Sequence, residues 1–190
     1  GEYLLGELVT RTAREQALAG GASGQQAIEA AMEPWIGNFY ADFFAVVNAV
    51  ALMVQLFLVS RLVKYLGVRV CLLILPLIAL GGYALLLVFP VLGVVRWAKT
   101  AENATDYSLQ NTVRNMLWLP TTRQEKYAAK QFVDTFCVRL GDVLSAVVVF
   151  VGTSWLAFSV AGFAAVNLAL VGLWLLVAVA IGRRFRQLTR

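Results

Sequence analysis

The sequence predicts an all-α membrane protein, a polytopic helix bundle with about five transmembrane helices and an N-terminal stub. Three observations predict this class. Apolar residues make up 60% of the 190 residues, charged residues make up 14%, and the mean hydropathy is +0.74. Soluble domains carry roughly a quarter charged residues, so this chain cannot cover itself with a polar surface. In addition, three long stretches contain no charge, and positive residues gather in clusters between them.

The uncharged stretches are residues 43–60, 70–95 and 143–182. A helix needs about 20 apolar residues to cross a hydrocarbon core ~30 Å thick, so the first two stretches each hold one span. The third would be about 60 Å long as one helix, twice the thickness of the bilayer, and must fold back. We expect its turn at residues 152–154. The spans predicted in this way are residues 36–60, 69–89, 127–152 and 156–182.

Residues 91–119 are harder to assign because they carry five charged side chains. Hydropathy alone favours a loop outside the membrane. Charge distribution favours a fifth crossing, since clusters of Lys and Arg stay on the cytoplasmic side. With a crossing, all three positive clusters face the cytoplasm; without it, the second and third face outward. The clusters are Arg61, Lys64 and Arg69; Arg123, Lys126 and Lys130; and Arg183, Arg184, Arg186 and Arg190.

The chain is expected to divide into two regions. Residues 1–34 hold the end of a truncated helix, residues 1–9, followed by an external connector. The connector contains the glycine-rich residues 20–24, which predict flexibility, and apolar residues at helical spacing from Ala27 to Trp35, which predict a short interfacial helix. Residues 35–190 form a five-helix transmembrane domain with a basic cytoplasmic tail.

Residue usage excludes several function classes. The chain has no histidine, which removes histidine-based acid–base catalysis and histidine-ligated metals. Two cysteines in apolar surroundings do not make a disulfide framework. No phosphate-binding P-loop motif is present, and a net charge of +5 is too small for a nucleic-acid binder. We therefore expect no enzyme, no cofactor, no metal and no nucleic-acid partner.

Charged residues inside predicted spans need an explanation, because each costs roughly 2.5–3.5 kcal/mol at a helix centre unless it faces protein or water. One interpretation is that they pair as clamps between helices. The other, which we favour, is a polar cavity that binds a charged solute. Polar residues of the third span recur at three- and four-residue steps, and those of the fourth form close pairs. The candidate solute-binding residues are Arg96, Lys99, Glu102, Asn103, Asp106, Arg114, Lys130, Asp134, Arg139 and Asp142.

Two segments carry a resemblance to a known family. Residues 60–69, Ser-Arg-Leu-Val-Lys-Tyr-Leu-Gly-Val-Arg, resemble the basic, glycine-containing cytoplasmic loop of major facilitator transporters. Residues 102–114 contain Glu-Asn-Ala-Thr-Asp-Tyr-Ser, and Leu-Pro-Thr and Lys-Tyr-Ala-Ala-Lys follow at residues 119–121 and 126–130. With Asp134, this combination resembles the second half of the ATP:ADP antiporter family, which belongs with the major facilitator group.

The resemblance implies that the five spans are the last five of twelve and that the stub ends the seventh. This chain would then be a half-transporter that lacks the N-terminal six-helix half. The implied localisation is multi-pass in a bacterial cytoplasmic membrane, with the C-terminus in the cytoplasm. The implied activity is alternating-access transport of a nucleotide or another anion. Asp142 departs from the pattern, because the family tends to have lysine there, and a carboxylate disfavours phosphate binding.

Three functional hypotheses follow. The first is a secondary transporter of an anionic solute, such as a nucleotide, bound by the arginines and by Lys99. The second is a proton-coupled carrier of another solute, in which Asp106, Asp134 or Asp142 titrates. The third is a membrane anchor or sensor that transports nothing, in which every charge is paired internally.

Overall fold

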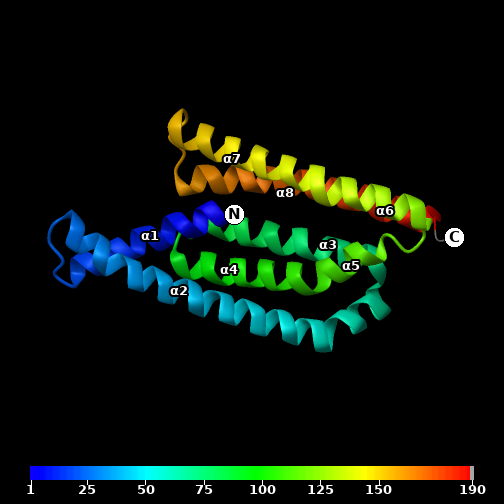
Figure 1. Ribbon diagram of the computed structural model, residues 1–190, viewed down its shortest axis with the longest axis horizontal. Helices are drawn as coiled ribbons and strands as arrows, with labels where there is room; N and C mark the ends of the chain where they lie inside the picture. Colours follow the sequence, from blue (N-terminus) through cyan, green and yellow to red (C-terminus); the bar gives the residue numbers. More distant parts are fainter. Residues whose placement is uncertain (189–190) are drawn as a thin grey trace.

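Helices make up almost all of residues 1–188, the part of the chain that the computed structural model describes (Figure 1). No strand occurs within these residues, which confirms the predicted all-α class. Arg190 and the side chain of Arg123, which were assigned to positive clusters, lie outside the described part. The elements are α1 Glu2–Ala19, α2 Gln25–Met53, η1 Val54–Leu58, α3 Val59–Val88, α4 Leu92–Thr105, η2 Asp106–Gln110, α5 Asn111–Met116, α6 Arg123–Phe132, η3 Val133–Cys137, α7 Val138–Ser154 and α8 Val160–Leu188.

Within the described residues, three helical stretches are long and apolar enough to cross a membrane: Gln25–Val88, Ala129–Ser154 and Val160–Leu188. The first has 64 residues and reverses direction at Gly67, whose φ of 77° and ψ of 162° break the helical path. That combination of angles is open essentially to glycine alone. The chain is therefore compatible with a membrane protein.

The N-terminal region is more helical than expected. The stub, residues 1–9, is part of the 18-residue helix α1, and the expected connector continues this helix to Ala19. A turn at residues 20–24 follows, in which Gly21 and Gly24 have positive φ values of 85° and 88°. The expected interfacial helix is not separate, because it continues into the first span as helix α2. In Figure 1, α1 and the start of α2 form a hairpin that projects beyond the end of α4.

Residues 92–116 form a helical rod that runs antiparallel to α3 and lies between α3 and α2 (Figure 1). The rod comprises α4, η2 and α5, and its charged residues keep it out of the set of membrane-length apolar helices. It buries the apolar side chains of Val95, Ala104, Leu109 and Val113, of which Val95 belongs to one core cluster and Leu109 and Val113 to another. This burial explains why a segment with five charges packs inside the bundle rather than forming an exposed loop.

Two clusters of buried side chains hold the helices together. The larger joins α1, α2, α3, α4 and α8 and is centred on Leu5, Phe43, Val47 and Ala164. The smaller joins α3, the rod and α8 around Cys71 and Val113. In contrast, α7 buries only Gly152, and its half-buried Val149 packs against the larger cluster.

The turn between α7 and α8 spans residues 155–159, just after the predicted position, because α7 continues to Ser154. It lies at the opposite end of the bundle from the Gly67 turn, the loop before α6 and the end of α8 (Figure 1). The described members of all three positive clusters belong to these last three segments. The three clusters therefore share one end of the molecule.

Three π-helical turns, η1, η2 and η3, interrupt α-helical hydrogen bonding. A π turn inserts extra backbone, so side-chain positions counted at 3.6 residues per turn shift across it. Two of the three hold candidate residues, Asp106 in η2 and Asp134 in η3. Because η3 spans Val133–Cys137, the positions of Asp134 and Asp142 around the helix differ from those in a regular α-helix.

Candidate functional site

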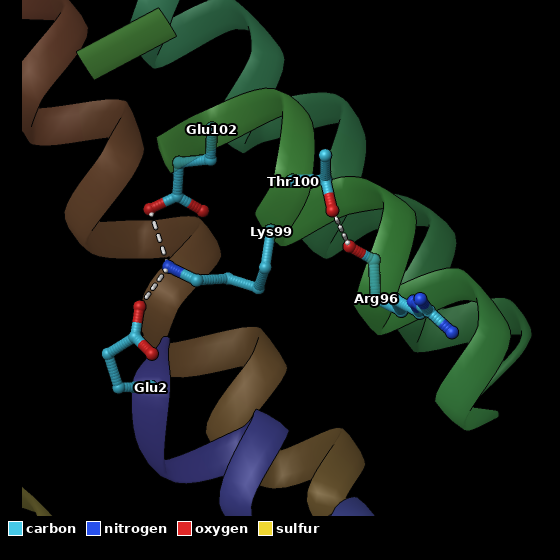
Figure 2. A network of polar contacts seen from close by, with 5 residues as sticks. All are labelled: Glu2, Arg96, Lys99, Thr100 and Glu102. Atoms are coloured by element: carbon cyan, nitrogen blue, oxygen red, sulfur yellow. Dashed lines mark hydrogen bonds and ion pairs between the residues drawn. The ribbon is translucent and has the colours of Figure 1, made fainter. Parts of the chain in front are cut away.

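The most deeply buried charge is Lys99 on α4, whose side chain is 6% exposed. Its Nζ atom lies 2.9 Å from Glu2 Oε1 of α1 and 3.1 Å from Glu102 Oε1, one turn further along α4. Figure 2 shows the ammonium group between the two carboxylates. Because both carboxylates belong to this chain, the arrangement ties α1 to α4 and leaves Lys99 paired.

Arg96 points away from this network (Figure 2). Its guanidinium carbon lies 5.4 Å from the centre of the Phe39 ring on α2, within the range of a cation–π contact. The Thr100 hydroxyl donates a 2.8 Å hydrogen bond to the Arg96 carbonyl oxygen. Arg96 therefore joins α4 to α2, whereas Lys99 joins α4 to α1.

Further along the rod, η2 and α5 carry polar groups with different surroundings. Asp106 is exposed, whereas Asn103 and Gln110 are half-buried. The buried Ser108 hydroxyl donates a 2.6 Å hydrogen bond to the Ala104 carbonyl oxygen. The Gln110 Oε1 atom is buried and accepts no hydrogen bond from the described residues.

A polar hollow of about 200 Å³ lies between α5 and the helix formed by α6 and η3. It brings together three candidate residues, Arg114 of α5, Lys130 of α6 and Asp134 of η3. Lys130 Nζ donates a 3.4 Å hydrogen bond to Asn115 Oδ1 across the hollow. The remaining lining residues are Asn111, Trp118 and Val133. Two cations, one carboxylate and two amides can bind an anion and balance its charge.

The last two candidate residues form an ion pair on α7. Arg139 Nη1 lies 3.6 Å from Asp142 Oδ2, and the side chains are 82% and 64% exposed. The helical stretch Ala129–Ser154 has 26 residues, so Asp142 lies near its midpoint. Apolar neighbours such as Val143 and Phe150 are also exposed. The exposed apolar residues of this helix are suited to contact with lipid, whereas its exposed charges are not.

The ten candidate residues do not converge on one site. Lys99 and Glu102 are paired near the contact with α1, Arg96 faces α2, and Arg114, Lys130 and Asp134 share the hollow. Arg139 and Asp142 follow further along the same helix as Asp134. Among the side chains that the structure describes, no cluster of His, Cys, Asp and Glu could hold a metal ion.

Sequence reasoning did not identify several residues that contact the candidate residues or line the polar hollow. Glu2 was assigned to the stub, and nothing local signals its contact with a residue so far along the chain. Phe39 carries no polar pattern either. Asn111 and Asn115 could have been found, because they are four residues apart and Asn115 Nδ2 donates a 2.9 Å hydrogen bond to the Asn111 carbonyl oxygen.

Comparison with protein-family models, with curated proteins and with solved structures finds no match.

Proposed function

We propose that this chain is part of a secondary membrane carrier for an anionic solute. The observation that carries the proposal is the exposed Arg139–Asp142 pair near the midpoint of a membrane-length helix. Charges at that depth are tolerated where they face water or protein rather than lipid. A wet path along this face satisfies that requirement, and carriers bind their substrates near the bilayer midplane.

The polar hollow supports a path that leads to this pair. It lies nearer the end with the positive clusters, and Arg114 and Lys130 give it the charge that attracts an anion. Asp134, Arg139 and Asp142 then succeed one another along one helix toward its midpoint. We therefore assign initial capture of the solute to Arg114 and Lys130, and binding at the midplane to Arg139.

The proposal includes five crossings, with the rod as the third. The rod has 25 residues and would be about 37 Å long, enough to cross the hydrocarbon core. Arg96, Lys99 and Glu102 are shielded by contacts with neighbouring helices, whereas Asp106 and Arg114 are exposed, and we expect them to face the wet path. Under this proposal the positive clusters and the C-terminus are cytoplasmic, and the missing wall of the cavity comes from a second six-helix half of major facilitator type.

Transport by the full-length protein in proteoliposomes tests the proposal. Radiolabelled ATP and ADP are the first solutes to supply, because the resemblance implies a nucleotide, with and without nucleotide inside the vesicles. The variant R139Q removes one charge-assisted contact, worth about 1.5–3 kcal/mol, and should lower affinity roughly 10- to 100-fold. R11Q is the matched control, because Arg11 lies on α1, where it pairs with Glu15 one turn away on the same helix.

A double variant separates solute binding from helix pairing. R139Q leaves Asp142 without its partner, whereas R139Q/D142N neutralises both. If Arg139 serves only Asp142, the double variant should recover transport; if Arg139 binds the solute, it should stay inactive. Unchanged transport by R139Q, R114Q and K130Q would overturn the assignment of these residues to the solute path. Absence of transport of every solute by the unaltered protein would support the non-transporting module instead.

The proton-coupled carrier remains the second candidate, because Asp134 lines the hollow next to Lys130. A carboxylate in a site that alternates between wet and closed states can carry a proton. The proton-coupled carrier would be favoured if a pH gradient drives uptake into vesicles without internal nucleotide and if D134N abolishes that uptake. Uptake that requires internal nucleotide and does not depend on the pH gradient would favour nucleotide exchange.

A further inference from the structure

A second depression, the α3–α8 groove, lies where the start of the transmembrane part of α3 meets the end of α8. Its volume is about 440 Å³. Most of its lining is apolar, including Leu66, Val70, Leu73 and Val179, and two arginines, Arg69 and Arg186, complete it. None of these residues belongs to the proposed transport path, so the groove needs an explanation of its own.

Two glycines shape the groove. The reversal at Gly67 divides the long helical stretch into two unequal segments, and Gly67 itself lines the groove. On α8, a Cβ atom placed on Gly182 would lie only 3.6 Å from Arg69 Cγ, so the Arg69 side chain lies across this glycine. Arg186 follows Gly182 by one helical turn and is on the same face of α8. Arg69 and Arg186 therefore lie at the same end of the groove.

The charges that α3 and α8 carry at this end favour an anion. No aspartate or glutamate occurs between residues 43 and 101 or after Asp142, so α3 and α8 carry no acidic residue. Arg61, Lys64 and Arg183 add positive charge nearby. Tyr65, 76% exposed, adds an aromatic side chain of the kind found at membrane–water interfaces.

The apolar part of the groove selects the kind of anion. Leu73 and Val179 lie one to two turns from the arginines, toward the middle of α3 and α8. Both helices belong to stretches long and apolar enough to span a membrane. An occupant must therefore offer a negative group at the helix ends and a hydrocarbon chain that extends toward the bilayer centre.

We propose that the α3–α8 groove binds one anionic phospholipid. Its phosphate lies at Arg69 and Arg186, and one acyl chain runs past Leu73 and Val179. Basic pockets between transmembrane helices on the cytoplasmic side recognise lipid headgroups by this combination of charge and apolar contact. The proposal does not depend on transport, because it rests on residues that the proposed path does not use.

Native mass spectrometry of the purified full-length protein tests the proposal directly. Phosphatidylglycerol and phosphatidylcholine with identical acyl chains are titrated in parallel, so only the headgroup charge differs. Each arginine near the surface contributes about 1 kcal/mol, so R69Q/R186Q should weaken phosphatidylglycerol binding about 25-fold. The control R11Q/R14Q removes the same charge from α1, at the other end of the bundle, and should bind as the unaltered protein does.

A second variant tests the apolar half of the groove. It keeps the proposal testable if R69Q/R186Q fails to fold. V179W fills the groove from a partly exposed position and should lower phosphatidylglycerol affinity with both arginines intact. Equal binding of the two lipids, or unchanged binding by R69Q/R186Q, would overturn the proposal. Displacement of phosphatidylglycerol by glycerol 3-phosphate alone would also overturn it, because that result would identify a soluble-anion site.

Discussion

Replacement of Lys99 by methionine tests whether its network is structural. Met keeps most of the apolar stem and removes the charge that lies 2.9 Å from Glu2 and 3.1 Å from Glu102. Breaking a fully buried ion pair costs about 3–5 kcal/mol. Here the carboxylates that lose their partner are 66% and 23% exposed, so water recovers part of that loss. We expect K99M to lower the free energy of unfolding by about 2–3 kcal/mol.

Thermal unfolding of the detergent-purified protein measures this effect. At 2–4 °C per kcal/mol for a chain of this size, K99M should lower Tm by about 4–12 °C. E2Q, which alters the more exposed carboxylate, should cost less than about 1 kcal/mol. K99M/E102Q should be more stable than K99M, because it removes the carboxylate left without a partner. An unchanged Tm for K99M together with loss of solute uptake would refute the structural role and identify Lys99 as a solute ligand.

Three further predictions concern the backbone and the hollow. G67A should lower stability by about 1–3 kcal/mol in thermal unfolding, because φ is 77° there, whereas G172A, at a helical glycine with open space around it, should not destabilise the protein. G152A should cost about 1–3 kcal/mol, because its Cβ would lie 2.7 Å from the ring of buried Phe163; an unchanged Tm would mean that α7 and α8 separate freely. R114Q should reduce solute uptake about tenfold and leave Tm within about 2 °C, because its side chain is exposed in the hollow; a large drop in Tm with normal uptake would contradict this role.

Much of the helical architecture could be predicted because it depends on local sequence. Uncharged runs of 26 and 40 residues require helices, and length alone demands a turn near residue 154. The sequence did not reveal that the helix of the stub continues through the first part of the expected connector, to Ala19. The buried residues of this part, Ala13 and Ala17, lie on one helical face of α1, which packs against α2. Small apolar residues gave too weak a hydropathy signal to reveal that contact.

The candidate site was less predictable because its geometry depends on contacts between distant segments. Spacing identified Arg114, Lys130 and Asp134 as polar, but only the packing of α5 against α6 brings them to one hollow. Lys99 matched the same pattern and yet lies paired between two carboxylates. The π turn η3 could not be read from composition, and it shifts Asp134 relative to Asp142. Sequence therefore indicated which residues matter but not which of them act together.

The arrangement of the helix ends supports a transmembrane rod. The Gly67 turn, the loop before α6 and the end of α8 lie at one end of the bundle (Figure 1). A bilayer perpendicular to the long axis therefore leaves Lys64, Lys126 and Arg183 on the same side, as positive clusters require. If the rod instead lay outside the bilayer, α3 and α7 would start on opposite sides and these residues would be divided between the two compartments. A crossing by the rod therefore satisfies the charge pattern, and its contacts with α2 and α3 are compatible with it.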